Sequence, residues 1–136
     1  MIITKETDYA LRVLRALQDG EKHTVGELAQ NELIPQQFAY KILKKLANRG
    51  LIRIFRGAGG GCSLAADLSR ATLYDVMEAM EESGELIACM DPGYQCPWRA
   101  AHGECTLHCR LAQIQQRLNE ELRRYSLQDI LSPLPM

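Results

Sequence analysis

The sequence has few aromatic residues, no long apolar run and almost no net charge. Aromatic residues make up 6% of its 136 positions, so a core must rest on Leu, Ile, Val and Ala. No stretch approaches the roughly 18 uninterrupted apolar residues that a membrane-spanning helix needs, so we expect no membrane partner. The N-terminus also lacks the apolar region and small-residue cleavage site of a signal peptide. These absences favour a cytoplasmic protein.

What is present is typical of a folded domain. Hydrophobic residues make up 46% and charged residues 24%, so disorder is not the default expectation. The length suits one compact domain, or a small domain followed by an oligomerisation helix. Five cysteines in a reducing compartment favour metal binding or redox chemistry over disulfides.

The net charge of −1 conceals an uneven distribution. Residues 1–61 contain ten basic and six acidic residues, whereas residues 62–136 contain six and eleven. The basic excess is concentrated from Lys41 to Arg56, where six basic residues occur without an acidic one. Such a face is suited to contacts with DNA phosphates, although a solvated helix surface would have the same composition.

Hydrophobic periodicity predicts three helices in the N-terminal half. The first runs from about Lys5 to Gln18. The second begins after Thr24, which forms a capping-box pattern with Glu27. The third begins near Pro35, a residue favoured at helix starts, and ends at Gly50.

The third helix is predicted to have an apolar inner face and a basic outer face. Its inner residues are Phe38, Ile42, Leu43 and Leu46. Its outer residues are Gln37, Lys41, Lys44, Lys45 and Asn48. Two helices joined by a short turn, the second with a basic outer face, form the helix-turn-helix pattern of DNA-binding proteins.

A β-hairpin is predicted directly after these helices. Residues 51–55 form a short strand, residues 57–61 a glycine-rich turn, and residues 62–64 the returning strand, with Arg56 just before the tip. The turn is not a phosphate-binding loop, because it opens no helix and carries no Lys-Ser/Thr. We interpret Cys62 as a small apolar strand residue with a structural role. The hairpin completes a winged helix-turn-helix.

The C-terminal half is predicted to end in one long helix. Thr72 caps a helix from Leu73 to about Glu82, residues 83–104 are irregular, and the last helix runs from about Thr106 to Arg124. Its near-heptad stripe is Leu107, Leu111, Ile114, Leu118, Leu122 and Tyr125. This stripe is about 28 Å long, and little else in the chain can cover it. We therefore expect a two-fold partner helix and a homodimer.

Most of the cysteines crowd into the segment before and at the start of the last helix. Cys89, Cys96, Cys105 and Cys109 fall within 21 residues, and His102 and His108 lie among them. The start of the last helix carries Cys105, His108 and Cys109 on one face. The loop before it has few apolar residues to pack, so a bound metal centre would explain its order.

Three chemistries could use these thiols. A structural zinc site usually has ligands paired two to four residues apart, whereas Cys89, Cys96 and Cys105 are widely spaced. That spacing favours an Fe–S cluster reached from a loop. A zinc-stabilised regulator, or a regulator whose thiols form disulfides on oxidation, remains the alternative. An enzyme with a Cys–His pair is not expected, because it would leave the basic third helix unexplained.

With these motifs placed, the chain resembles the Rrf-type family of winged-helix transcription regulators, which includes IscR, NsrR, RirA and CymR. The resemblance covers essentially the whole chain. The segments that carry it are Thr7 to Arg12, Lys41 to Leu46, Gly50-Leu51, the wing from Arg56 to Gly61, Thr72 to Val76, the three spaced cysteines, and Tyr125 to Ile130.

The resemblance implies a cofactor and its ligands. Cys89, Cys96 and Cys105 correspond to the three cysteines that bind a 2Fe–2S or 4Fe–4S cluster in the family. The fourth ligand is a histidine in IscR-like members, which is His108 here, and an aspartate of the other subunit in NsrR-like members, which is Asp8 here. This sequence has both, and adds Cys109, which the family pattern lacks.

We therefore expect a mostly α winged helix-turn-helix DNA-binding region at residues 1–66. A cluster-binding loop and dimerisation helix would follow at residues 67–136. The function expected is sequence-specific repression of transcription, with DNA affinity controlled by an Fe–S cluster that senses iron, redox state or nitric oxide. In a homodimer the two recognition helices would read a near-palindromic operator in double-stranded DNA, with half-sites about 34 Å apart.

Individual DNA contacts follow from position on the third helix and the wing. Gln36, Gln37 and Tyr40, at the exposed start of the helix, are the expected base readers. Phosphate contacts are expected from Lys41, Lys44 and Lys45, and a minor-groove contact from Arg56.

Overall fold

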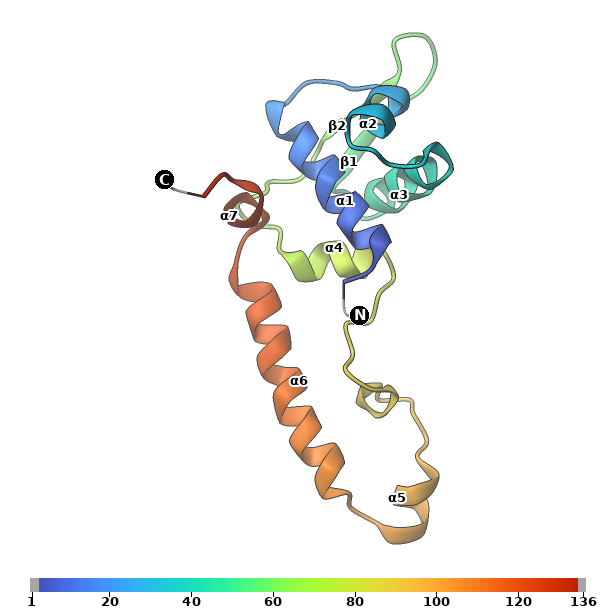
Figure 1. The fold of residues 1–136 in the computed structure, drawn as a ribbon, viewed down its shortest axis with the longest axis vertical. Helices are drawn as coiled ribbons and strands as arrows, with labels where there is room; N and C mark the ends of the chain where they lie inside the picture. The colour runs from blue at the N-terminus through green and yellow to red at the C-terminus, as the bar shows by residue number, and fades with distance from the viewer. Residues whose placement is uncertain (1–2, 135–136) are drawn as a thin grey trace.

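The computed structural model describes residues 3–134 and has two parts, a helical core and an extended arm (Figure 1). The core begins with α1 (Lys5–Ala16), which a 3₁₀ turn at Leu17–Asp19 extends. It continues through α2 (Val25–Asn31), α3 (Gln36–Asn48), β1 (Ile52–Phe55), β2 (Gly61–Leu64) and α4 (Leu73–Ala79). The arm comprises a 3₁₀ turn at Ala88–Met90, α5 (Pro97–His102) and α6 (Thr106–Arg124), and α7 (Leu127–Leu131) returns to the core.

This architecture confirms the predicted mostly α winged-helix fold. The three N-terminal helices lie where periodicity places them, and Thr24 Oγ1 caps α2 by accepting a hydrogen bond from the Glu27 N–H at 3.1 Å. The strands pair antiparallel, with Ile52 opposite Leu64 and Phe55 opposite Gly61. Within residues 3–134, no helix combines the length and the apolar character needed to cross a membrane.

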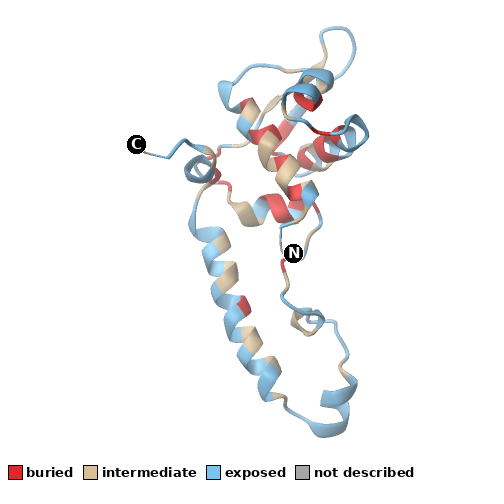
Figure 2. Ribbon diagram, viewed as in Figure 1, coloured by how far each residue is buried: buried red, intermediate tan, exposed pale blue. Residues whose placement is uncertain are grey.

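The hydrophobic core lies between α1, α3 and α4, as the buried residues in Figure 2 show. Leucine, isoleucine, valine, alanine and methionine fill it. Side chains that are at most 2% exposed include Val13, Leu14, Leu17, Ile42, Leu46, Val76, Met80 and Leu127. The core therefore joins residues from both halves of the chain, and the boundary after residue 66 stays a prediction.

The inner face of α3 differs from the prediction at one position. Phe38 is 39% exposed, and its ring lies 6.3 Å from that of Tyr9, whereas Ala39 is 1% exposed. The buried face follows Ala39, Ile42, Leu43 and Leu46, which have the regular spacing of one helical stripe. An alanine at this position lets α3 approach its neighbours closely.

The buried Cys62 ties the wing to the segment before α2. Its N–H donates to the His23 carbonyl oxygen at 2.8 Å, and the His23 N–H donates back to its carbonyl at 2.9 Å. The side chain is 1% exposed, and burial raises the pKa of the thiol to about 11. The expected structural role of Cys62 is confirmed.

The C-terminal half has three features that the sequence did not predict. The helix α4 ends at Ala79 rather than near Glu82, because Glu81 adopts a left-handed backbone with φ of 60°. A short helix, α5, interrupts the segment expected to be irregular. Finally, α7 buries Leu127 completely, and the Leu127 N–H donates to the Ala71 carbonyl oxygen at 2.7 Å.

The apolar stripe of α6 is divided between two environments. Leu111, Leu118 and Leu122 are half-buried within the chain, whereas Leu107 and Ile114 are 64% and 55% exposed. The chain thus covers part of a stripe that we expected to lie entirely at a dimer interface. Gln115, a polar residue, is the most buried position of the helix at 8% exposed.

Two glycines of the wing allow a test of its packing. Both have positive φ, but a Cβ at Gly61 would overlap the His23 carbonyl, whereas a Cβ at Gly57 meets nothing within 4 Å. Backbone strain alone should destabilise Gly57→Ala by roughly 1–2 kcal/mol. Overlap should add about 1–3 kcal/mol for Gly61→Ala. Urea unfolding midpoints measure both variants, and equal midpoints would contradict this packing.

Candidate metal centre and nucleic-acid interface

A cavity of about 550 Å³ lies at the end of the arm, between the 3₁₀ turn, α5 and the start of α6. Cys89, Cys96, Cys105 and His108 all line it. Most of the remaining wall is apolar or aromatic: Ile87, Ala88, Tyr94, Trp98, Leu107 and Leu111. The structure thus brings together four of the six residues that the sequence nominates as candidate cluster ligands. We call this the cysteine pocket.

The polar atoms of the cysteine pocket are available for coordination. Cys89, Cys96 and Cys105 are free thiols of intermediate exposure. The Cys105 Sγ accepts a hydrogen bond from the His108 N–H at 3.3 Å, in the position of a helix cap. His108 Nδ1 is buried without a hydrogen-bond partner. A buried nitrogen without a partner is costly unless something binds it, so His108 fits the role of a ligand.

The candidate ligands of the cysteine pocket surround a cavity and do not meet at one position. Across residues 3–134, no three His, Cys, Asp or Glu side chains converge closely enough to hold a single metal ion. Three cysteines and a histidine around a cavity of about 550 Å³ are a donor set of the kind that holds a group of several metal atoms, such as an Fe–S cluster.

The two other candidate ligands lie outside the cysteine pocket of the same chain. Cys109 is exposed and does not line the cavity. Asp8 belongs to α1, where its carboxylate accepts a hydrogen bond from Arg12 at 2.9 Å. The Arg12 guanidinium also donates to the Glu32 carbonyl oxygen at 3.0 Å, at the end of α2. Asp8 is thus attached to the helix-turn-helix.

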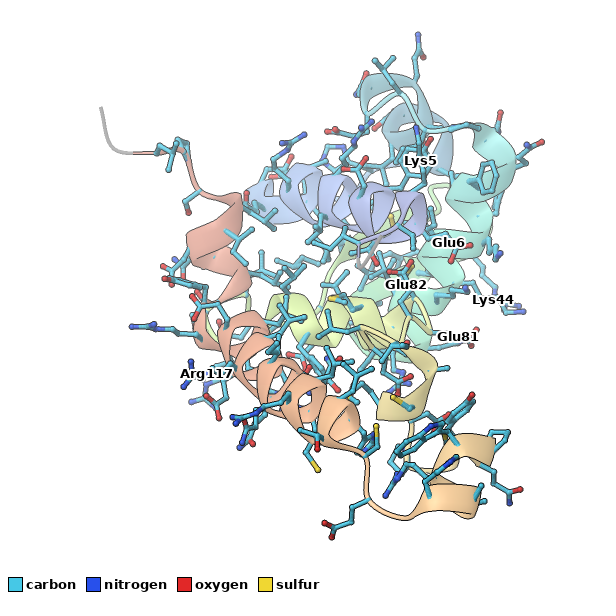
Figure 3. All side chains as sticks on the ribbon, turned by 60° about the horizontal axis from the view of Figure 1, so that its bottom comes forward. Lys5, Glu6, Lys44, Glu81, Glu82 and Arg117 are labelled. Atoms are coloured by element: carbon cyan, nitrogen blue, oxygen red, sulfur yellow. The ribbon has the colours of Figure 1, made fainter. Side chains whose placement is uncertain are left out.

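The expected base readers lie on the surface at the start of α3. Gln36 and Gln37 are exposed, and Tyr40 is 59% exposed. Lys44 is exposed and points away from the protein in Figure 3. Arg56 is exposed between β1 and the wing turn. These side chains are all accessible to a partner of the size of DNA.

Two of the expected phosphate contacts are instead engaged within the chain. The Glu6 carboxylate pairs with Lys41 at 2.7 Å and with Lys45 at 2.9 Å. Hydrogen bonds from the two lysines lower the pKa of Glu6, and the hydrogen bond to Glu6 raises the pKa of Lys41. The Lys45 side chain is only 18% exposed. Sequence periodicity placed it on the outer face, but a contact between residues 39 positions apart gives no local signal.

Comparison with known proteins gives a consistent match. The sequence profile of the Rrf2 family, described as "Iron-dependent Transcriptional regulator", matches residues 3–133. Protein aau3 of Rhizobium meliloti is 32% identical, over 99% of this chain and 88% of its own length. The HTH-type transcriptional regulator NsrR of Geobacillus kaustophilus is 34% identical, over 96% of this chain and 90% of its own.

A solved structure has the same fold. CymR, the global cysteine regulator of B. subtilis, superimposes with a TM-score of 0.73 over 98% of each chain. Its sequence is 20% identical, so the likeness concerns the fold alone.

The pairing of Lys45 with Glu6 leads to a prediction about salt dependence. With mixed-sequence duplex DNA, Lys44→Ala should reduce the slope of log affinity against log salt by about 1, because it removes a phosphate contact. Lys45→Ala should leave the slope near that of the wild type, because its ammonium already has a carboxylate partner. Titrations at several salt concentrations measure both. Equal reductions would mean that Lys45 leaves Glu6 to contact phosphate.

Proposed function

The chain belongs to the Rrf2 family of transcriptional regulators, and from this premise we propose that it is a homodimeric repressor controlled by an Fe–S cluster in the cysteine pocket. Members of this family bind DNA and regulate transcription, and they are not enzymes. The proposal adds the cofactor, its ligands and the dimer. One observation supports it most: Cys89, Cys96, Cys105 and His108 line one cavity, and the buried Nδ1 of His108 has no hydrogen-bond partner.

The protein residues would hold the cofactor from three elements. Cys89 comes from the 3₁₀ turn, Cys96 stands before α5, and Cys105 and His108 stand at the start of α6. A bound 2Fe–2S or 4Fe–4S cluster would supply a centre that responds to iron, redox state or nitric oxide. The N-terminal N–H groups of α6 favour negative charge, and so suit an anionic cluster held at Cys105. The mostly apolar walls place few competing polar groups beside these donors.

The DNA-binding part of the proposal rests on the exposed start of α3 and on the wing. Gln36, Gln37 and Tyr40 would contact bases, Lys44 a phosphate, and Arg56 the minor groove. Lys41 is half exposed and can contact a phosphate beside its pair with Glu6. Two-fold symmetry of the dimer would require a near-palindromic operator. A cytoplasmic location belongs to the same proposal, because a repressor acts where the chromosome is.

Anaerobic reconstitution of the full chain with iron and sulfide tests the cofactor. We expect visible absorbance and the Mössbauer spectrum of an Fe–S cluster, and at least about a fivefold difference in DNA affinity between apo and holo protein. The DNA would be a duplex selected from a random pool. Cys105→Ala should prevent assembly, whereas the matched control Cys62→Ala should not. A colourless zinc protein, or one that responds only through disulfides, would contradict the proposal.

The same spectra identify the fourth ligand. His108→Ala should shift the spectrum or prevent stable assembly, because it removes the imidazole that lines the cysteine pocket. Asp8→Ala and Cys109→Ala should leave the spectrum near that of the wild type. An altered spectrum for Asp8→Ala alone would assign the ligand to the partner subunit, and three normal spectra would assign it to a molecule from outside.

The dimer is tested at the exposed part of the α6 stripe. Ile114→Glu should convert the protein to a monomer, because an unpaired carboxylate buried in an interface costs several kcal/mol. Gln116→Glu is the matched control, since it adds the same charge at an exposed position about 200° around the helix. Analytical ultracentrifugation gives the mass in solution. A stable dimer of Ile114→Glu would exclude this seam.

A further inference from the structure

The segment from Glu81 to Leu86 connects the core to the arm. It is hydrogen-bonded to the core at one end and to the arm at the other. It follows α4 and leads to the 3₁₀ turn that carries Cys89. Glu82 is bound to α1, whereas the backbone at Gly84 and Leu86 is bound to α6. We call residues 81–86 the strap. The positive φ of Glu81 marks its start, in a conformation that glycine usually adopts.

The hydrogen bond of Glu82 joins the strap to α1, which is itself paired with the recognition helix α3. Thr7 is completely buried, and its Oγ1 donates to Glu82 Oε2 at 2.6 Å across 75 positions of sequence. The neighbouring Glu6 holds Lys41 and Lys45 of α3. Figure 3 shows Glu82 near the end of α1 that carries Glu6. A shift of the strap at Glu82 therefore acts on α1, and through Glu6 on α3.

The other end of the strap is held by Gln115, whose side-chain amide is buried on α6. Its Nε2 donates to the Gly84 carbonyl oxygen at 2.9 Å, and its Oε1 accepts from the Leu86 N–H at 2.7 Å. A second hydrogen bond from Nε2 reaches Asn119 Oδ1 at 2.9 Å, which fixes the orientation of the amide. Leu86 stands three residues before Cys89, so Gln115 fixes the approach of the chain to the cysteine pocket.

We propose that Glu82 and Gln115 are positioning residues that couple the cysteine pocket to the recognition helix of the same chain through the strap. When Cys89 becomes ordered, the strap shifts, and the shift reaches Glu82 because the hydrogen bonds of Gln115 prevent the strap from bending between the two residues. The inference rests on the proposed function only for the nature of the signal. Coupling between two sites is reciprocal, so DNA bound at α3 should also shift the conformations that Cys89 adopts, and with them its reaction rate.

Reciprocity allows a test with apo protein, in which no cofactor takes part. The probe is the rate at which a maleimide modifies Cys89, followed by mass spectrometry, with and without sheared mixed-sequence duplex DNA at low salt. For the wild type we expect DNA to change this rate by at least about fivefold. For Thr7→Val, which keeps the side-chain shape but removes the donor, the ratio should fall to about one.

Three further variants separate coupling from a general loss of structure. Thr7→Ser keeps the hydroxyl and should restore the wild-type ratio. Ser69→Ala is the matched control, because it removes a hydroxyl that also donates to a carboxylate, that of Asp67, at 2.6 Å outside the strap. Its ratio should be unchanged. Gln115→Leu should lower the ratio as Thr7→Val does. It tests the hydrogen bonds between α6 and the strap without altering α1.

Two results would overturn the inference. One is a DNA-independent rate in the wild type, and the other is a wild-type ratio in both Thr7→Val and Gln115→Leu. Failure of the cluster to assemble would contradict the proposed function, but it would leave these rates in apo protein unaffected. The two proposals therefore fail on different measurements.

Discussion

The arm that carries the cysteines depends on the anchoring of α6 to the core at its C-terminal end. Leu127, just beyond α6, is completely buried, and its N–H binds the Ala71 carbonyl oxygen. The Arg123 guanidinium stacks over the Tyr74 ring of α4 at 3.9 Å. From this anchor the helix reaches outward to Cys105, so the cysteine pocket is formed far from the hydrophobic core (Figure 1). Within residues 91–104, Cys96 is the one residue of intermediate burial, and the others are exposed.

This separation would let one chain combine a rigid DNA-binding core with a pocket that responds to a bound group, as we propose. The core has the close packing that fixes the geometry of α3. The segment around α5 is mostly exposed and buries little apolar surface in the chain, so its local stability is expected to be low. Elements of low local stability are those that respond to ligands, whereas the hydrogen bonds of Gln115 hold the strap against α6.

Sequence reasoning predicted the elements well where the signal is local. The bounds of α6 match from Thr106 to Arg124, and the capping residues Thr24 and Thr72 lie where their patterns place them. It failed where contacts are distant in sequence. The pairing of Glu6 with Lys45, and the burial of Gln115, depend on neighbours that periodicity cannot identify. The four candidate ligands that line the cysteine pocket were nominated from spacing and resemblance, and the fold brings them to one cavity.

The remaining cysteine provides the protein with an internal reporter. At neutral pH a thiol with a pKa of about 11 is almost entirely protonated, and the thiolate is the reactive form. Cys62 is also 1% exposed, between the wing and the chain before α2. A thiol reagent therefore distinguishes four accessible cysteines from a fifth that reacts when the winged helix opens. The reactivity of Cys62 thus reports whether the winged helix is folded, independently of the state of the four thiols in the arm.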